Sequence, residues 1–307
     1  MSFKKINRRL ATLATMAYAD VFNFPFTRKE FILWMIKDTH LPLAVRAIKE
    51  TGGYYFFKGK SRLVELRRKR EAYQEGKWEI GRRAAGYLSW IPSIQLIGIT
   101  GGLAMNNARA EDDIDLFVIT SQGTLWASRL LATLLLDALK LRRRPNDMTV
   151  ADKVCLNMFM APSYMVGISW GLEVPKREHD LFSAHEVLQM QPLFVRGEAY
   201  HKFLRANEWV SQYLPKAWDA RTQGLGERPH VYKPAPVDEL IIWFLRMVEF
   251  PLKAVQLWYM HDHRTREVIS DSAIRFHPKD ARIWIKRKLA ARLIKYHIPL
   301  DKVFYAG

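Results

Sequence analysis

A glycine pair and two alternating aspartates, separated by ten residues, constrain the fold of this chain more than any other feature. Gly101 and Gly102 precede Asp113-Ile114-Asp115, which opens an apolar run that ends at Ile119. Residues two apart in a strand project from the same face, so the two aspartates should stand side by side while Ile114 points into the core. Two carboxylates this close repel each other unless a hard cation lies between them, and such oxygen ligands suit Mg²⁺. The pattern therefore predicts a strand over 114–120 beside a magnesium site.

The glycines indicate what binds next to that metal. Because glycine has no Cβ, the backbone N–H groups of Gly101 and Gly102 can approach a phosphate closely. A phosphate-binding turn beside a paired-carboxylate magnesium site is what phosphoryl or nucleotidyl transfer requires. We therefore expect Gly101 and Gly102 to bind nucleotide, and Asp113 and Asp115 to be both catalytic residues and metal ligands.

The segment from Gly101 to Leu116 resembles the active-site signature of the DNA polymerase β-like nucleotidyltransferase superfamily, in its minimal-nucleotidyltransferase form. That signature reads Gly-Ser-x-Ala-x-Gly, five variable residues, then Ser-Asp-Ile-Asp-Leu, and it aligns here without a gap. The identical positions are Gly101, Ala104, Asp113, Ile114, Asp115 and Leu116. Gly102 and Asp112 each replace a serine, and Asn106 replaces the second glycine. Asparagine also tolerates a left-handed backbone, so a turn at Asn106 is still expected.

The resemblance implies three carboxylates, of which two share one strand and hold two Mg²⁺ ions about 3.5–4 Å apart. Asp113 and Asp115 match those two positions. The third carboxylate should lie on the strand expected over 153–160, whose central polar residue is Asn157. Three interpretations stay open: Asn157 is the third ligand through its carbonyl oxygen, Asp152 reaches in from just ahead of the strand, or the domain binds nucleotide without turning it over.

The charge distribution and the cysteine count indicate which partners and which cellular compartment suit this chain. Residues 1–95 hold 19 Lys and Arg against 8 Asp and Glu, a net charge of +11, whereas residues 96–170 are neutral and residues 171–307 carry +6. This asymmetry favours nucleic acid as a candidate partner through the basic N-terminal third, with an anionic membrane surface as a weaker alternative. The single cysteine, Cys155, excludes an internal disulfide and fits the cytoplasm.

No integral membrane segment is expected. The uncharged stretch 154–172 is interrupted by Asn157, Pro162 and Gly167, so it indicates a strand, a turn and a second strand rather than a span. The apolar run 241–260 contains Arg246 and other charged residues, which also argues against a span.

Residues 1–60 have the pattern of a winged helix-turn-helix domain. Apolar spacing predicts a helix over 7–19, and Thr27 with Glu30 forms a capping box that begins a second helix. Pro42 opens an expected third helix over 43–50, which Gly52-Gly53 would end. The aromatic run that follows, 54–60, has the form of a β-wing. In a DNA-binding domain the third helix would read the groove.

The remaining chain divides into three expected parts. Residues 61–90 predict a basic connecting helix with a break at Gly76 or Gly81. Residues 91–175 are the expected catalytic domain, with strands over 95–100, 114–120 and 153–160 and a helix over 123–141. Arg129, early in that helix, is a candidate for nucleotide binding. Residues 176–307 predict a helical domain with helices over 178–191, 198–213, 235–262 and 280–296. The expected fold is therefore α+β: a small mixed β-sheet nucleotidyltransferase core, with helices on one side of the sheet, flanked by the winged helix and the helical domain.

The leading hypothesis is a cytoplasmic, Mg²⁺-dependent nucleotidyltransferase. It would move a nucleoside monophosphate from an NTP to a hydroxyl of RNA, a protein or a small molecule. The alternative is a DNA-binding regulator whose catalytically weak nucleotidyltransferase-like domain only senses nucleotide.

Overall fold

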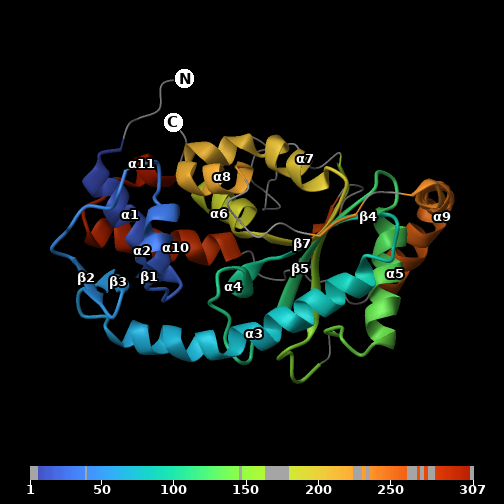
Figure 1. Ribbon diagram of the computed structural model, residues 1–307, viewed down its shortest axis with the longest axis horizontal. Helices are drawn as coiled ribbons and strands as arrows, with labels where there is room; N and C mark the ends of the chain where they lie inside the picture. Colours follow the sequence, from blue (N-terminus) through green and yellow to red (C-terminus); the bar gives the residue numbers. More distant parts are fainter. Residues whose placement is uncertain are drawn as a thin grey trace.

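The computed structural model describes residues 6–38, 40–144, 147–162, 180–223, 230–232, 235–260, 268–269, 273–275 and 281–304. These residues form a mixed α+β structure with a three-stranded sheet at one end and a seven-stranded sheet near the middle (Figure 1). The mixed α+β class is therefore confirmed. The second strand expected after Pro162 lies outside the described residues, and the expected domain boundaries stay a prediction.

The described helices are α1 (Arg8–Val21), α2 (Arg28–Leu33), α3 (Arg62–Leu88), α4 (Gly101–Ala104), α5 (Leu125–Ala138), α6 (Leu181–Gln189), α7 (Ala199–Ala206), the 3-10 helix η2 (Glu208–Gln212), α8 (Pro215–Thr222), α9 (Pro236–Met260), α10 (Ala281–Lys295) and α11 (Leu300–Phe304). The described strands are β1 (Phe26–Thr27), β2 (Ile48–Thr51), β3 (Tyr54–Phe57), β4 (Ile94–Ile99), β5 (Ile114–Thr120), β6 (Val154–Met160), β7 (Gln191–Arg196), β8 (His230–Tyr232), β9 (Val268–Ile269) and β10 (Ala273–Arg275).

The N-terminal region has a strand, β3, within the expected wing, but its described residues lack the third helix of the predicted winged helix-turn-helix. The capping box is present, since the Thr27 side chain accepts from the backbone of Glu30 and the Glu30 carboxylate accepts from the backbone of Thr27. The helix expected over 43–50 is wrong, because β2 occupies Ile48–Thr51 and pairs with β3. Gly52 and Gly53 both have positive φ, +60° and +83°, which suits a tight hairpin turn rather than a helix end.

Helix α3 is one continuous helix of 27 residues, so the expected break at Gly76 or Gly81 is wrong. Gly81 serves packing instead of bending. A Cβ at that position would lie 2.7 Å from Cδ1 of Ile99, which shows that the helix lies directly on the sheet. As Figure 1 shows, α3 runs from the N-terminal three-stranded sheet to the central sheet.

The central sheet has the strand order β8-β7-β4-β5-β6-β10-β9. Its middle confirms the strands expected over 95–100, 114–120 and 153–160, which are β4, β5 and β6. β4 and β5 are antiparallel, whereas β5 and β6 are parallel and are joined through α5. The all-helical pattern expected after residue 178 is wrong at Gln191–Arg196, because β7 pairs there with β4.

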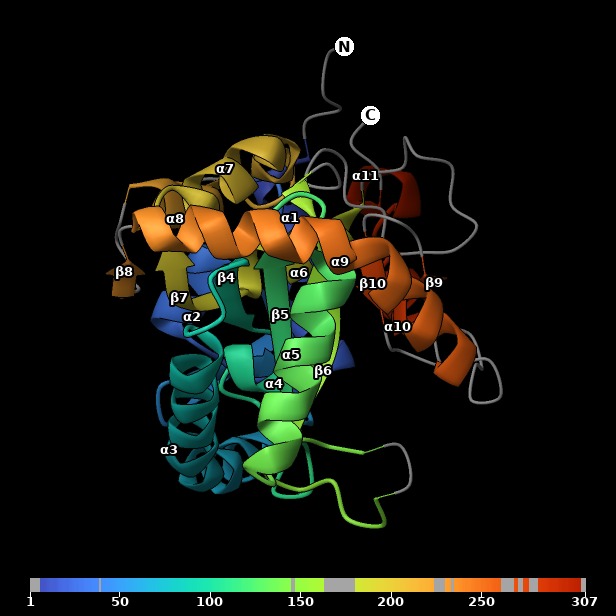
Figure 2. The ribbon, with the colours of Figure 1, turned by 90° about the vertical axis from the view of Figure 1, so that its right-hand side faces the viewer.

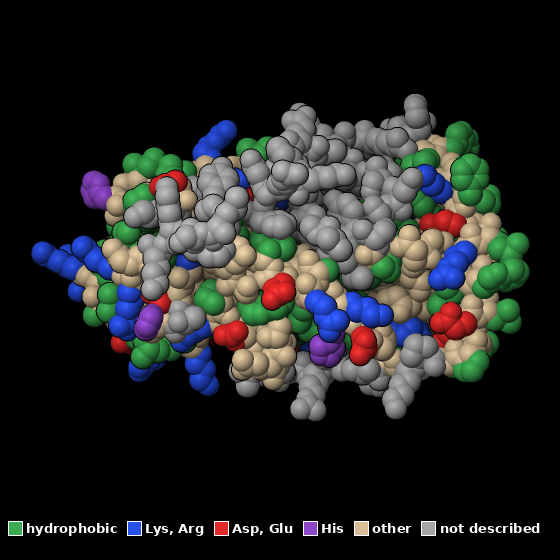
Figure 3. Space-filling view, turned by 90° about the horizontal axis from the view of Figure 1, so that it is seen from above, with side chains coloured by type: hydrophobic (Ala, Val, Ile, Leu, Met, Phe, Trp, Pro, Cys, Tyr) green, Lys and Arg blue, Asp and Glu red, His purple; other side chains and the backbone are tan. Residues whose placement is uncertain are grey.

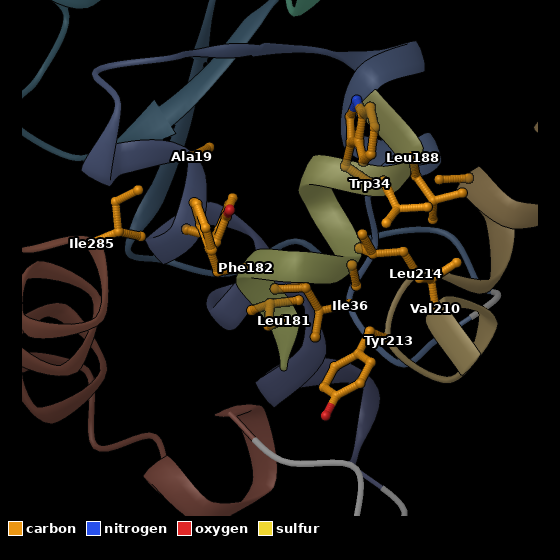
Figure 4. Packing of buried hydrophobic residues seen from close by; sticks show 14 of the residues in the cluster. Ala19, Trp34, Ile36, Leu181, Phe182, Leu188, Val210, Tyr213, Leu214 and Ile285 are labelled. Atoms are coloured by element: carbon orange, nitrogen blue, oxygen red, sulfur yellow. The ribbon is translucent and has the colours of Figure 1, made fainter. Parts of the chain in front are cut away.

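Helices cover both faces of the central sheet, which corrects the expectation of helices on one side. Ile114, Leu116 and Val118 pack in one hydrophobic cluster with residues of α3, α5 and α9. Phe117 and Ile119 pack in a second cluster with residues of α1, α6 and α10. Figure 2 shows α5 and α9 on the first side of the sheet, and Figure 4 shows the packing of the second cluster around Phe182 and Ile285. Because of strand alternation, Asp113 and Asp115 share the side of Phe117.

Helix α9 buries Ile242, Leu245 and Met260 but presents most of its large apolar side chains outward. Two of its polar side chains contact the protein: Glu249 accepts from the backbone of α5, and Gln256 donates to the Trp126 carbonyl. The large apolar residues of α9 with exposed side chains are Val237, Leu240, Ile241, Trp243, Phe244, Met247, Phe250, Val255, Trp258 and Tyr259. Hydrophobic side chains accordingly gather at the right-hand end of the molecule in Figure 3, where Figure 1 places α9. Among the described helices, none has the combination of length and apolar content that crossing a membrane demands.

Candidate active site

The structure brings Asp113 and Asp115 together, as the alternation predicted. One ligand atom each from Asp113, Asp115 and Cys155 lies within 4.8 Å of the others. All three residues are half-buried. The Oδ1 atom of Asp115 is buried and has no hydrogen-bond partner among the described residues. A buried acceptor without a partner costs about 1–3 kcal/mol, so this arrangement favours a ligand at that oxygen.

The glycine turn lies directly on the second aspartate. Gly101 has a φ of +67°, and a Cβ there would lie 2.8 Å from Oδ2 of Asp115. The backbone N–H of the neighbouring Thr100 donates to the Asp115 carbonyl at 3.0 Å. Asn106 has a φ of 51°, so the expected left-handed turn at that position is confirmed. The two halves of the signature therefore meet in space, and only glycine fits at position 101.

Asn157 lies at an irregularity in β6. Asp115 pairs with Cys155 and Phe117 pairs with Met158, so two residues of β6, Leu156 and Asn157, lie opposite the single residue Leu116 of β5. Such bulges re-aim side chains next to active sites. The Oδ1 atom of Asn157 is buried without a hydrogen-bond partner among the described residues, and Asn157 lines the same cavity as Asp115.

The other candidate for the third position, Asp152, is engaged elsewhere. Its Oδ1 accepts from Nζ of the buried Lys77 at 2.7 Å, and it is not among the cavity-lining residues. Arg129 also lies away from the site. It is on α5, on the opposite side of the sheet, where it donates to the Gln256 side chain of α9. Of the residues suggested by sequence, the structure thus brings together Gly101, Gly102, Asp113, Asp115 and Asn157.

Arg143 is a site residue that the sequence did not reveal. Its Nη1 donates to Oδ2 of Asp113 at 2.7 Å. Arg142 and Arg144 instead pair with Asp137 near the end of α5, as expected for cations at a helix C-terminus. This segment runs extended beside β6, and the Arg143 N–H donates to the Val154 carbonyl. Successive side chains of an extended segment point to opposite sides, so Arg143 faces Asp113 while Arg142 and Arg144 face the other way. Recognising 142–144 as extended would have separated Arg143 from its neighbours.

Helix α3 fixes the loop between the glycine turn and the aspartates. Arg70 donates to the Asn107 side chain, and Gln74 donates to the Ala108 carbonyl. Nζ of Lys77 donates to the carbonyls of Ala110 and Asp112. All three α3 side chains are buried although the helix is strongly basic in sequence. Part of the basic run therefore organises the signature loop instead of forming an open surface for nucleic acid.

A cavity of about 210 Å³ opens beside Asp115. Most of its lining side chains are apolar, and many are aromatic. They come from α1, the following turn and β1, the glycine turn and the loop after it, β5, β6, α6 and α10: Tyr18, Ala19, Phe22, Phe24, Phe26, Thr100, Gly101, Gly102, Met105, Asn107, Asp115, Phe117, Asn157, Met158, Phe182, His185, Glu186, Gln189, Ala281, Trp284 and Ile285. Sequence reasoning missed the walls from α1, α6 and α10, because these segments are far from the signature along the chain.

The electrostatics at Asp115 favour a cation. Burial, and after it the charge of Asp113, raises the pKa of Asp115 to about 8. Burial also raises the pKa of the Cys155 thiol, so the sulfur stays protonated and is a poor ligand. Asp113, Asp115 and the Asn157 amide oxygen are hard oxygen donors of the kind that Mg²⁺ prefers. These residues therefore fit the magnesium site that the signature predicts.

Comparison with models of known protein families, with curated proteins and with solved structures finds no match to this chain.

Proposed function

We propose that this chain is a Mg²⁺-dependent nucleotidyltransferase of the DNA polymerase β-like type. One observation carries the proposal: Gly101, at the start of the signature, touches the carboxylate of Asp115 near its end, with Asp113 beside it. A positive-φ glycine at a carboxylate pair is needed for a phosphate-binding turn next to a metal, and nothing in strand packing alone requires it.

In the proposed reaction, an acceptor hydroxyl oxygen forms a bond to the α-phosphorus of an NTP. The bond from that phosphorus to the oxygen bridging the α- and β-phosphates breaks, pyrophosphate leaves with the electron pair, and the hydroxyl proton passes to water. Asp113 and Asp115 would hold Mg²⁺, which supplies positive charge opposite the reacting phosphate.

The protein's own groups have separate roles in this proposal. The N–H groups of the Gly101-Gly102 turn bind phosphate oxygens, because no Cβ blocks their approach. Arg143 orients the Asp113 carboxylate through the 2.7 Å hydrogen bond. Asn157 supplies a third oxygen in place of a carboxylate and takes no proton at neutral pH.

The test is transfer of label from α-³²P-labelled NTPs, in Mg²⁺, to panels of RNA, protein and small-molecule acceptors. Removing a partner of a metal ligand already costs roughly 10–100-fold. We therefore expect Asp113→Asn and Asp115→Asn each to reduce labelling by more than about 100-fold. Asp219→Asn, an exposed carboxylate of α8, is the matched control and should label normally. Undiminished labelling by the Asp113→Asn, Asp115→Asn double variant would refute the proposal.

The DNA-binding alternative has less support. Within the described residues, the segment 41–47 contains no helix, so the groove-reading element of the expected winged helix is missing from its place. Nucleic acid stays a predicted partner of the basic N-terminal third. Salt-dependent, sequence-selective DNA binding without nucleotide turnover would favour the regulator over the enzyme.

A further inference from the structure

We propose that a groove between α2, the segment 41–46 and the edge strand β2 binds an acidic segment of a partner protein in extended form. The groove belongs to the N-terminal end of the molecule, where Figure 1 places β2 and β3. It shares no described lining residue with the cavity beside Asp115, so the inference does not rest on the proposed function. Three features carry it: the charge of the groove, the unpaired edge of β2 and the aliphatic floor.

The groove is a formed feature of the fold. Its volume of about 670 Å³ lies within the range of about 300–1,000 Å³ that is usual for ligand sites. The segment 41–46 forms one wall and is attached to α1 at two points. Nε of Arg8 donates to the Leu41 carbonyl at 2.6 Å, and the Leu43 N–H donates to Oγ1 of the buried Thr12 at 3.0 Å. These bonds hold the wall in place before any partner binds.

The charged side chains of the groove are mostly basic. Among the described lining residues the cations are Arg8, Arg28, Arg46 and Lys49, and the one carboxylate is Glu50. Arg28, Arg46 and Lys49 are exposed, and no described residue gives any of their side chains an ion pair or a hydrogen bond. Oε1 of Glu50 accepts from the Gly53 N–H at 3.1 Å, which directs this carboxylate toward the hairpin turn. The groove therefore has an excess of positive charge that attracts carboxylates.

Strand β2 has an unpaired edge beside these cations. In the sheet order β1-β3-β2, the described residues pair β2 on one side only. The Lys58 N–H donates to the Ala47 carbonyl, and opposite residues of antiparallel strands alternate between bonded and non-bonded pairs. Lys49 therefore bonds with β3, whereas the carbonyl of Ile48 and both backbone groups of Glu50 point away from it. An exposed edge of this kind is a template for a further strand, and proteins commonly recognise extended peptides in this way.

The floor of the groove favours a peptide over nucleic acid. Its apolar side chains are mainly aliphatic: Ile32, Leu41, Leu43, Val45 and Ile48. In a bound strand, aliphatic side chains can face this floor while the alternate side chains carry the acidic groups. Single-stranded nucleic acid binds mainly by stacking its bases on aromatic rings. Here Phe31 is buried, and Tyr55 contacts it with ring centroids 5.7 Å apart, so neither ring offers an open face of that kind.

A second copy of the chain is a poorer occupant of the same edge. In a symmetric dimer the same surface of both subunits meets at the interface. Pairing β2 with β2 would then place one basic groove against another, and like charges that lie opposite each other are destabilising. Charge thus favours a partner of opposite sign.

Acetylated hexapeptide amides with one backbone pattern and different charge test the inference. The probes are three repeats of Glu-Val, of Gln-Val and of Lys-Val, and titration calorimetry measures their binding to the full chain. A strand of four residues spans about 13 Å, so six residues cover the edge of β2. We expect the Glu-Val peptide to bind about tenfold more tightly than the Gln-Val peptide, and the Lys-Val peptide to bind most weakly. Equal affinities, or no binding of the Glu-Val peptide, would overturn the inference.

A fourth probe tests the edge of β2 itself. The Glu-Val peptide with N-methyl groups on its third and fourth residues keeps its charge but loses two backbone donors, one on each side of the strand. It should bind about fivefold more weakly than the parent peptide, because it cannot complete the hydrogen bonds to β2. Undiminished binding of the methylated peptide would show that charge alone attracts it and would overturn the pairing with β2.

Substitutions then locate the binding site. The double variant Arg28→Gln, Arg46→Gln should weaken binding of the Glu-Val peptide about fivefold and leave that of the Gln-Val peptide unchanged. The double variant Arg83→Gln, Arg205→Gln, at exposed positions of α3 and α7, lowers the net charge equally and should keep the full affinity. Equal losses in the two double variants would show a general charge effect and would overturn the assignment to the groove.

The other occupants give distinct results. Binding of a hexathymidylate that Arg28→Gln, Arg46→Gln weakens, without binding of the Glu-Val peptide, would assign the groove to nucleic acid. Self-association in sedimentation velocity that Leu43→Glu abolishes, again without binding of the Glu-Val peptide, would assign it to a second copy. Either result would overturn the inference and leave the proposed nucleotidyl transfer untouched.

Discussion

His185 should make the stability of the folded chain depend on pH between about 3 and 6.5. The imidazole is buried, stacks between Tyr18 and Trp34, and has an Nε2 atom without a partner among the described residues. Burial lowers its pKa from 6.5 to about 3. The unfolded chain therefore binds a proton at His185 between these values and the folded chain does not. The stabilising contribution is complete above pH 6.5 and is lost as the pH falls toward 3.

The size of this effect follows from the shift. Well below pH 6.5 each pH unit costs about 1.4 kcal/mol, so the loss from alkaline pH down to about pH 4.5 is about 2.7 kcal/mol. The unfolding free energy is measured by urea titration at several pH values for the wild type and for His185→Phe, which keeps an aromatic ring in the stack. The difference between the two proteins cancels the other titrating groups. Parallel pH profiles for wild type and variant would show that His185 is protonated in the folded state and would refute the reasoning.

Three further substitutions test contacts that hold the site. Glu249→Ala should lower the free energy of unfolding, measured by heat or urea, by about 1–2 kcal/mol, because the carboxylate accepts from the N–H groups of Trp126 and Ala127 at the start of α5. Glu239→Ala, at an exposed position of the same helix, should lower it less, and equal losses would argue against the cap. Lys77→Met should lower the free energy of unfolding by about 1–3 kcal/mol, because Lys77 donates to two carbonyls of the signature loop. Lys69→Met, which removes an exposed ion pair on the same helix, should leave the unfolding free energy unchanged within experimental error. An unchanged unfolding free energy in Lys77→Met would show that the loop does not depend on this side chain. Gly101→Ala should lower the free energy of unfolding by about 1–2 kcal/mol because of its left-handed backbone, and its Cβ should displace Asp115 and abolish label transfer. Gly86→Ala, in open space on α3, should leave label transfer intact. Full label transfer by Gly101→Ala would show that the glycine turn is not part of the active site.

Local chemistry determines which parts of this fold the sequence could predict. β5 was predictable because its two signals, the alternating aspartates and the apolar run, lie in one short segment. The Thr27–Glu30 capping box is equally local. The helix expected over 43–50 failed because Gly52-Gly53 is compatible with both a helix end and a hairpin, and only pairing with β3 decides between them. β7 was missed because its place depends on pairing with β4, almost a hundred residues earlier.

The same distinction applies to the candidate site. Asp113, Asp115 and the glycines belong to one contiguous motif, and that motif was readable. Arg143 reaches Asp113 only because the chain after α5 runs extended beside β6. Glu186 and the aromatic wall are assembled from segments before and after the motif, and no spacing rule connects them.

The cavity draws its walls from α1, near the beginning of the described chain, and from α10, near its end. A fragment cut to residues 91–175 would retain both aspartates and the glycine turn yet leave Phe117 and its neighbours bare to water. Such a truncation would remove part of the cavity wall and would also reduce solubility, because apolar side chains would be exposed. A fragment that keeps the whole cavity therefore extends from α1 through α10, and a mutational screen confined to residues 101–116 would not test the walls that α1 and α10 supply.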